Sequence, residues 1–219
     1  MEVKIPVPNT LRDIPLHKYQ SLITKENPTD EDSIVCLLDI QRGHVKHIKQ
    51  ADYEFLVEAS KKMFDVETPL IKNFTLNGIT YGFIPNLDEI TYGENKDITK
   101  YLSEWGNMHK AMAVLYRPIT KKIGEKYLIE PYEGSHFYSD QLKEMPLDIA
   151  LGASVFFYRL IRDLLSCIQS YLEKNKQELE KNRDSQTNYQ TSETDLQSAG
   201  EAMQSYILLL KEILQSLKR

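Results

Sequence analysis

His109 has the surroundings that come closest to catalytic chemistry in this sequence. It lies in the stretch "EWGNMHKAM", close to Glu104, and a histidine beside a carboxylate is the smallest set of groups for general base catalysis. The stretch holds no nucleophile or electrophile for such a base to serve. We therefore predict a partly buried histidine at the edge of the core beside Trp105, and we keep a small enzyme acting through His109 and nearby acids as an alternative.

Metal chemistry has one candidate in the sequence. The stretch "HVKH" places His44 and His47 three residues apart, a spacing at which two imidazoles on a helix can share a metal ion if other donors join them. No cysteine lies near this pair, and a hinge between two helices is the simpler interpretation. Phosphate-loop, nucleophile-elbow, zincin and paired-cysteine motifs are absent from the sequence. We predict no catalytic residue, no metal site and no cofactor.

The composition is that of a globular protein without a nucleic-acid-binding surface. Of 219 residues, 41% are hydrophobic and 27% charged, and the net charge is −5. Because a phosphate backbone is bound by clustered Lys and Arg, we expect no nucleic acid as a principal ligand. We find no leader and no apolar run near the roughly 18 residues of a membrane span. Cys36 and Cys167 both lie in apolar helical patterns, which favours buried, reduced thiols and a cytoplasmic location over one disulfide.

The elements that must position these residues are mostly helices. Apolar residues recur every three or four positions over most of the chain, and capping boxes are expected at Thr29 with Asp32 and at Thr91 with Glu94. The helical stretch that begins at Thr91 is interrupted near Gly106 and ended by Pro118. The expected helices span residues 14–24, 29–43, 50–64, 91–117 and 147–173.

One β-hairpin is expected in the stretch "IKNFTLNGITYGFIP". Asn77 and Gly78 separate two alternating segments, and Asn-Gly supplies the two positive φ angles of a type I′ turn. A short strand in "EKYLIEPY" and an extended arm or edge strand at residues 3–7 are weaker patterns. The expected fold class is therefore α+β, predominantly α-helical, with one β-hairpin and a C-terminal helical appendage.

Two stretches of the chain have nearly the same sequence pattern. Residues 7–20, "VPNTLRDIPLHKYQ", and residues 84–96, "IPNLDEITYGENK", each run from a β-branched residue through Pro and Asn to Leu, an acid and Ile. A looser copy, "MPLDIALGA", covers residues 145–153. Proline favours an extended entry, and an acid stabilises a helix N-terminus. We interpret the motif as a corner that turns extended chain into helix, with duplication of a unit left open.

The chain changes composition after Lys174. We predict a globular core at residues 1–173, a polar linker or helical extension at 174–195, and an amphipathic helix at 196–219. The last helix carries apolar residues at spacings of four and three, and it is our candidate partner-binding helix. An ordinary helix that folds back on the core is the alternative. The candidate seam consists of Met203, Ile207, Leu210, Leu214 and Leu217.

Four stretches of the sequence together resemble a protein family of tailed double-stranded DNA phages, including crAss-like phages. They are "IPVPNTLRDIPLHKYQSL", "TLNGITYGFIPNLDEITYGE", "YLSEWGNMHKAMAVLYRPI" and "MPLDIALGASVFFYRL". The resemblance covers roughly residues 5–173 and is associated with tail assembly chaperones. It contributes no catalytic residues.

The resemblance implies a non-enzymatic morphogenesis protein that holds tail or tape-measure components before assembly. Its partners would be other phage structural or assembly proteins, or a second copy through the C-terminal helix, in the cytoplasm of an infected bacterium. A virion component, either at the head-to-tail connector or packaged in the capsid, is the alternative. A host-takeover effector that uses His109 forms the third class.

Overall fold

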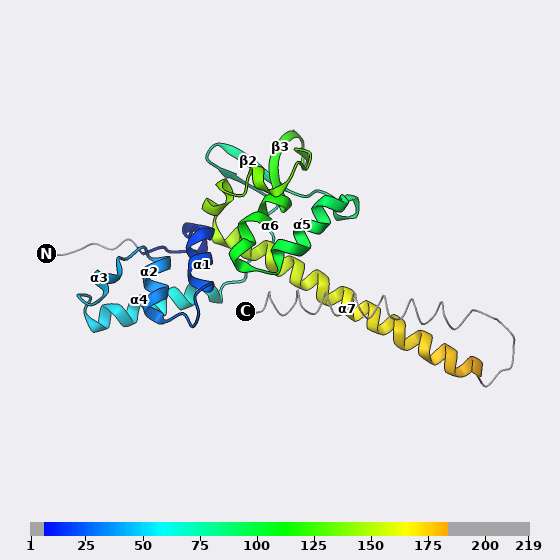
Figure 1. Ribbon diagram of the computed structural model, residues 1–219, viewed down its shortest axis with the longest axis horizontal. Helices are drawn as coiled ribbons and strands as arrows, with labels where there is room; N and C mark the ends of the chain where they lie inside the picture. Colours follow the sequence, from blue (N-terminus) through cyan, green and yellow to red (C-terminus); the bar gives the residue numbers. More distant parts are fainter. Residues whose placement is uncertain (1–6, 184–219) are drawn as a thin grey trace. The chain divides into compact units, whose positions relative to one another are not determined.

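The structure is a computed structural model that describes residues 7–183 (Figure 1). Beyond Asp163 it describes side chains only at Ser166, Ser170 and Glu173. Internal contacts divide the chain into two compact units, Met1–Val155 and Phe156–Arg219. Helix α7 (Leu147–Arg183) begins in the first unit, and every other element described below lies in that unit.

The fold is mixed α+β and mostly helical, at 57%, which confirms the predicted class. The helices form where the sequence places apolar residues at helical spacing. The α-helices before α7 are α1 (Leu16–Ile23), α2 (Asp30–Leu37), α3 (Arg42–Val45), α4 (Gln50–Lys62), α5 (Tyr92–Leu102) and α6 (Met108–Leu115). Short 3-10 turns join them at η1 (Leu11–Asp13), η2 (Met63–Asp65), η3 (Leu87–Glu89), η4 (Trp105–Asn107), η5 (Ser135–Phe137) and η6 (Gln141–Glu144).

Four antiparallel strands form one sheet in the order β1-β2-β3-β4. The predicted hairpin is its first half, because Asn77 (φ 50°) and Gly78 (φ 80°) make the turn between the first two strands. Phe74 lies opposite Tyr81 in this register, and their rings stack at 5.5 Å. The strands are β1 (Asn73–Leu76), β2 (Ile79–Phe83), β3 (Tyr116–Ile123) and β4 (Lys126–Ile129).

The prediction of one hairpin is wrong in number, because β3 and β4 form a second one. The helix expected to run to Pro118 ends at Leu115, and Pro118 lies inside β3. Residues 111–116 are all buried, and a fully buried apolar run has no amphipathic period that separates helix from strand. Pro118 lacks an amide hydrogen, but its carbonyl accepts a hydrogen bond from the Glu130 amide at 2.9 Å. The strand therefore tolerates this proline.

Two other predicted boundaries move. The helix that begins with the Thr29 capping box ends at Leu37 instead of near Gly43, because the chain turns at Asp39 with a φ of 59°. Helix α7 reaches Arg183, so residues 174–183 continue it. The predicted domain boundaries stay predictions, and the C-terminal helix with its candidate seam, from Met203 to Leu217, lies outside the described residues.

The repeated motif forms corners that lead into helices. In the first copy, an Asp13 carboxylate oxygen accepts hydrogen bonds from the Asn9 and Thr10 amides, at 3.1 Å each, and closes η1. In the second copy, the Asn86 side chain accepts from the Asp88 amide at 3.1 Å and starts η3. In both, the polar side chains satisfy backbone donors that the turn leaves unpaired.

The first and third copies of the motif pair with each other through their prolines. Pro15 and Pro146 form an isolated antiparallel bridge. On either side of it, the Leu16 amide donates to the Met145 carbonyl at 2.9 Å and the Leu147 amide donates to the Ile14 carbonyl at 2.8 Å. Ile14, Leu16, Met145 and Leu147 are at most 1% exposed. This proline bridge places the starts of α1 and α7 side by side in the core.

A buried ion pair connects α5 to β3. Glu94 completes the capping box of α5 by accepting from the Thr91 amide at 2.7 Å, and its other oxygen lies 2.5 Å from the Arg117 guanidinium. Burial opposes ionisation of Glu94, but hydrogen bonds from Thr91 and the charge of Arg117 together hold its pKa below the ordinary value. Arg117 also stacks over the Tyr132 ring at 5.6 Å. One carboxylate therefore serves both the helix end and the strand.

Replacing Gly152 tests the packing of α7 against the chain before β1. A Cβ atom at Gly152 would collide with the Pro69 carbonyl oxygen, whereas a Cβ at Gly43, also helical, meets nothing within 4 Å. We expect Gly152→Ala to lower the free energy of unfolding by about 1–3 kcal/mol, and Gly43→Ala to leave it unchanged or raise it by up to about 1 kcal/mol. Urea unfolding monitored by circular dichroism measures both. Equal midpoints for the two variants would contradict the close contact.

Candidate functional site

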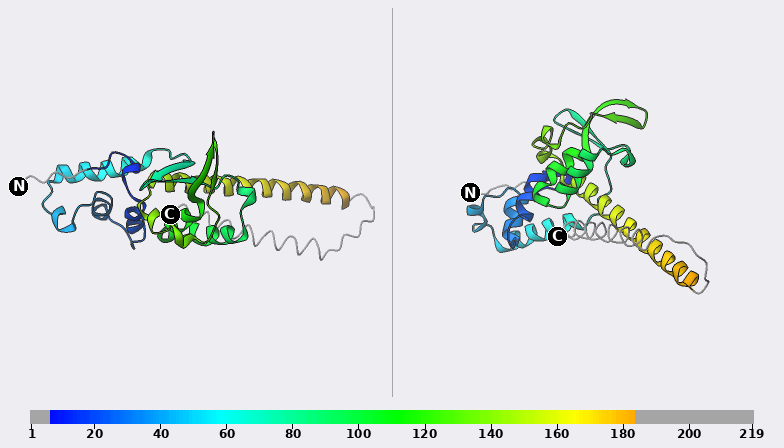
Figure 2. Two further views of the ribbon diagram at one scale, coloured as in Figure 1. Left: turned by 90° about the horizontal axis from the view of Figure 1, so that it is seen from above. Right: turned by 45° about the vertical axis from the view of Figure 1, so that its right-hand side comes forward.

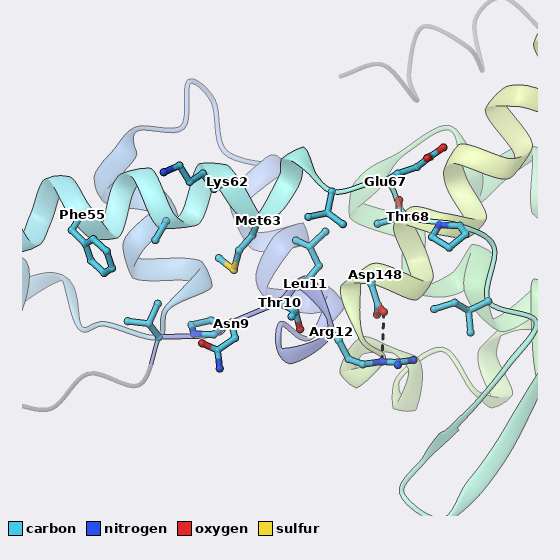
Figure 3. Close-up of a pocket in the computed structure, with 16 residues that line it drawn as sticks. Asn9, Thr10, Leu11, Arg12, Phe55, Lys62, Met63, Glu67, Thr68 and Asp148 are labelled. Carbon is cyan, nitrogen blue, oxygen red and sulfur yellow. Dashed lines mark ion pairs between the residues drawn. The ribbon is translucent and has the colours of Figure 1, made fainter.

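A groove of about 650 Å³ opens between the first motif copy and α4 (Figure 3). Residues 7–12 line one side of it, and the other side comes from α4, η2 and the chain that leads to Ile71. Asp148, in the first turn of α7, also lines the groove. We call this hollow the α4 groove. Its lining consists of Val7, Pro8, Asn9, Thr10, Leu11, Arg12, Phe55, Ala59, Lys62, Met63, Val66, Glu67, Thr68, Pro69, Ile71 and Asp148.

The α4 groove combines a buried apolar base with exposed apolar side chains. Leu11 and Met63 are buried, but Phe55 and Val66 are each 66% exposed. Figure 3 shows Phe55 and Met63 pointing from the α4 side toward residues 7–12. Large apolar groups that stay exposed around a hollow are typical of binding surfaces. The groove therefore offers apolar area that another molecule can cover.

Arg12, Asp148 and Lys62, three charged residues that line the groove, form ion pairs. Arg12 Nε lies 3.5 Å from an oxygen of Asp148, the contact drawn as a dashed line in Figure 3. Burial raises the pKa of Asp148, and the charge of Arg12 only partly offsets that effect. Lys62 lies 2.7 Å from Glu58 one helical turn earlier. Because these charges compensate each other, the apolar side chains determine what the groove binds.

The histidines of "HVKH" lie at a hinge between two helices. His44 belongs to α3, His47 lies two residues after the end of this helix, and both side chains are exposed. Among the described residues, no three His, Cys, Asp or Glu side chains gather in a way that could hold a metal ion. The part of the chain with described structure also has no helix with the length and apolar character needed to cross a bilayer.

His109 is held by Gln20 and not by Glu104. The Gln20 side-chain amide lies 3.0 Å from His109 Nδ1 and donates to the Trp105 carbonyl at 2.7 Å. Glu104 instead accepts a hydrogen bond from the Asn107 side chain at 2.6 Å. The structure therefore does not pair His109 with Glu104, and it confirms a half-buried histidine in this stretch.

Sequence reasoning missed both Gln20 and the α4 groove. Gln20 lies on the apolar side of α1 and is 7% exposed, and a polar residue in an apolar helical stripe was the signal that a buried hydrogen bond exists. Phe55 and Ala59 form a second apolar stripe on α4, separate from the buried Leu56 stripe. Two stripes on one helix indicate two packing surfaces.

The comparisons with known proteins add no relative. No family model matches this chain, and no curated protein and no solved structure matches it significantly. The family resemblance given by the four sequence stretches therefore stays a prediction.

The buried environment of His109 predicts a pH effect on stability. Burial lowers the pKa of His109, the nearby charges of Lys143 and Lys110 lower it further, and the charge of Asp140 offsets these effects only in part. The pKa of a histidine in an unfolded chain is about 6.5. A histidine whose pKa is lower in the folded protein contributes stability at pH values above the unfolded-state pKa, and this contribution is lost as the pH falls through the folded-state pKa. Between about pH 7.5 and pH 5, the free energy of unfolding should fall more steeply in the parent than in His109→Asn.

The measurement is urea unfolding at several pH values. His47→Asn is the matched control, since that ring is exposed, and it should follow the parent curve. Parallel curves for His109→Asn and the parent would show that the buried ring does not titrate with unfolding.

Proposed function

We propose that this protein is a non-enzymatic assembly chaperone of tailed phages that holds an apolar helix of a tail or tape-measure component in the α4 groove. The observation that carries the proposal is the exposure of Phe55 and Val66 around a preformed apolar hollow. The phage setting rests on the sequence resemblance, and the mode of binding rests on the groove.

The shape of the exposed surface favours a helix as the occupant. Phe55, Ala59 and Met63 recur every four residues along the α4 side of the groove and form one ridge, whose exposure falls from Phe55 to the buried Met63. Helix α4 has 13 residues, which corresponds to about 20 Å of length. A ridge of this kind packs into the groove of a neighbouring helix. A partner helix of about three or four turns with its own apolar stripe therefore fits this surface.

The expected energy favours reversible binding. Complete burial of a large apolar side chain contributes about 1.5–3 kcal/mol, so covering Phe55 and Val66, each two-thirds exposed, contributes about 2–4 kcal/mol in total. Association costs at least as much in lost freedom. The remainder of the interface must supply the net affinity, and the result is a contact that releases its partner. Such a contact suits a chaperone better than a permanent virion joint.

A charge placed in the groove should weaken partner binding without unfolding the protein. We expect Phe55→Asp to weaken binding of the partner helix about tenfold, since 1.4 kcal/mol of lost binding is a factor of ten in Kd. In a phage that encodes this chain, the variant should therefore lower the yield of complete tailed particles. Tyr92→Asp is the matched control, because Tyr92 is an aromatic residue at 83% exposure away from the groove. Plaque counts and electron microscopy measure the yield, and thermal unfolding checks that both variants fold.

Mass spectrometry of purified virions and of infected cells separates the two morphogenesis roles. A chaperone should be abundant in infected cells and absent from virions. A stoichiometric signal from the virions would overturn the chaperone proposal in favour of a structural component. A small apolar molecule is the other candidate occupant of the α4 groove, and native mass spectrometry of the purified protein tests for it. If the protein carries such a molecule and Phe55→Asp releases it, the small molecule would replace the partner helix as the proposed occupant.

A further inference from the structure

The hairpin of β3 and β4 has an exposed face of mixed character. Lys121 pairs with Leu128 and Ile123 pairs with Lys126 in its register, so these four side chains share one face. All four are exposed, with Ile123 at 67% and Leu128 at 61%. Figure 2 shows the hairpin extending beyond the other strands of the sheet. On this face Lys121 and Lys126 lie diagonally across from each other, and so do Ile123 and Leu128.

The lysines of this hairpin lack carboxylate partners among the described residues. Lys121, Lys122 and Lys126 make no ion pair there, although the protein carries a net charge of −5. Lys18, Lys25, Lys61 and Lys62 do face carboxylates, whereas Lys46 and Lys49 are exposed and make no ion pair among the described residues. Residues 121–129 hold three lysines against one carboxylate, Glu125 in the turn. The hairpin therefore keeps an excess of positive charge on an acidic protein, and a partner with acidic groups complements it.

The outer edge of β4 is unpaired within the described sheet. β4 is the last strand in the sheet order, so part of its backbone hydrogen-bonding capacity is unused by other strands. Lysines on an edge strand usually protect it against unwanted pairing. Protection alone does not account for Ile123 and Leu128, since exposed aliphatic side chains promote association. The unpaired edge of β4, the lysines and the two aliphatic side chains together form a surface that can bind a strand selectively.

We propose that the β4 edge binds an extended acidic segment of a partner protein, which adds a fifth strand with an acid beside Lys126 and an apolar residue beside Leu128. Backbone hydrogen bonds supply affinity, and the alternating neighbours supply selectivity for an acid and an apolar residue two positions apart. This docking edge does not depend on the α4 groove.

The hairpin chemistry favours a peptide over the two other anionic classes. Bases of single-stranded nucleic acid stack on aromatic side chains, and this face has Lys, Ile and Leu instead. A membrane-surface element buries a continuous apolar face, whereas here each aliphatic side chain lies opposite a lysine. Only a strand uses the unpaired backbone of β4.

Fluorescence anisotropy with the full chain and a labelled peptide, Thr-Glu-Thr-Val-Thr-Glu-Thr, tests the docking edge. We expect saturable binding that weakens with salt. The double variant Lys121→Glu with Lys126→Glu should lower the affinity about tenfold, since each exposed pair contributes up to about 1 kcal/mol. The matched control, Lys46→Glu with Lys49→Glu, changes two exposed lysines away from the sheet and should bind as the parent does.

A peptide N-methylated on alternate residues separates strand addition from simple charge attraction. Strand addition requires backbone donors, so the methylated peptide should not bind. Equal binding of the two peptides, or no binding of either, overturns the proposal. Tighter binding to vesicles of phosphatidylglycerol and phosphatidylcholine than to the peptide would also overturn it, in favour of a membrane surface.

Discussion

The bridge between Pro15 and Pro146 is the constraint on which the first unit depends. Two chain segments far apart in sequence meet there through reciprocal hydrogen bonds from Leu16 and Leu147. A proline has no amide hydrogen, so each one occupies a bridge position without leaving a buried donor unpaired. Proline also disfavours helical backbone at the residue before it, but it is tolerated at the start of a helix. The bridge therefore joins the two segments and fixes the points at which α1 and α7 begin.

The two helix starts position both the polar and the apolar residues that line the α4 groove. The motif copy that contains Pro15 also lines the α4 groove through residues 7–12, and the copy that contains Pro146 supplies Asp148. Helix α1 then carries Gln20 to His109, and the His17 ring lies 3.2 Å from the Lys143 carbonyl. The groove wall is thus anchored by core residues that take no part in binding. A preformed wall reduces the ordering cost of association.

Local interactions were predictable from the sequence, and long-range ones were not. The capping box at Thr91 and the Asn77 turn depend on neighbouring residues, so their patterns identify them. Tyr116 begins a strand because it is buried between distant segments, and its hydroxyl donates to the Ile71 carbonyl at 2.8 Å. No local pattern contains that partner. The α4 groove was missed for the same reason: Phe55 becomes a groove residue only where residues 7–12 pass alongside α4.

The two candidate surfaces differ in the physical term that dominates them. In the α4 groove Arg12, Asp148 and Lys62 are paired, so hydrophobic burial would govern the proposed binding and would give affinity with little selectivity. On the hairpin the lysines make no ion pair with any residue that the structure describes, so charge would select the proposed partner and speed its encounter. The hairpin can present that charge because its base is fixed: Arg117 is neutralised by Glu94 in the core, and Tyr127 donates to the Phe83 carbonyl at 2.8 Å. A rigid base below an exposed edge allows a new strand to pair without first ordering the hairpin.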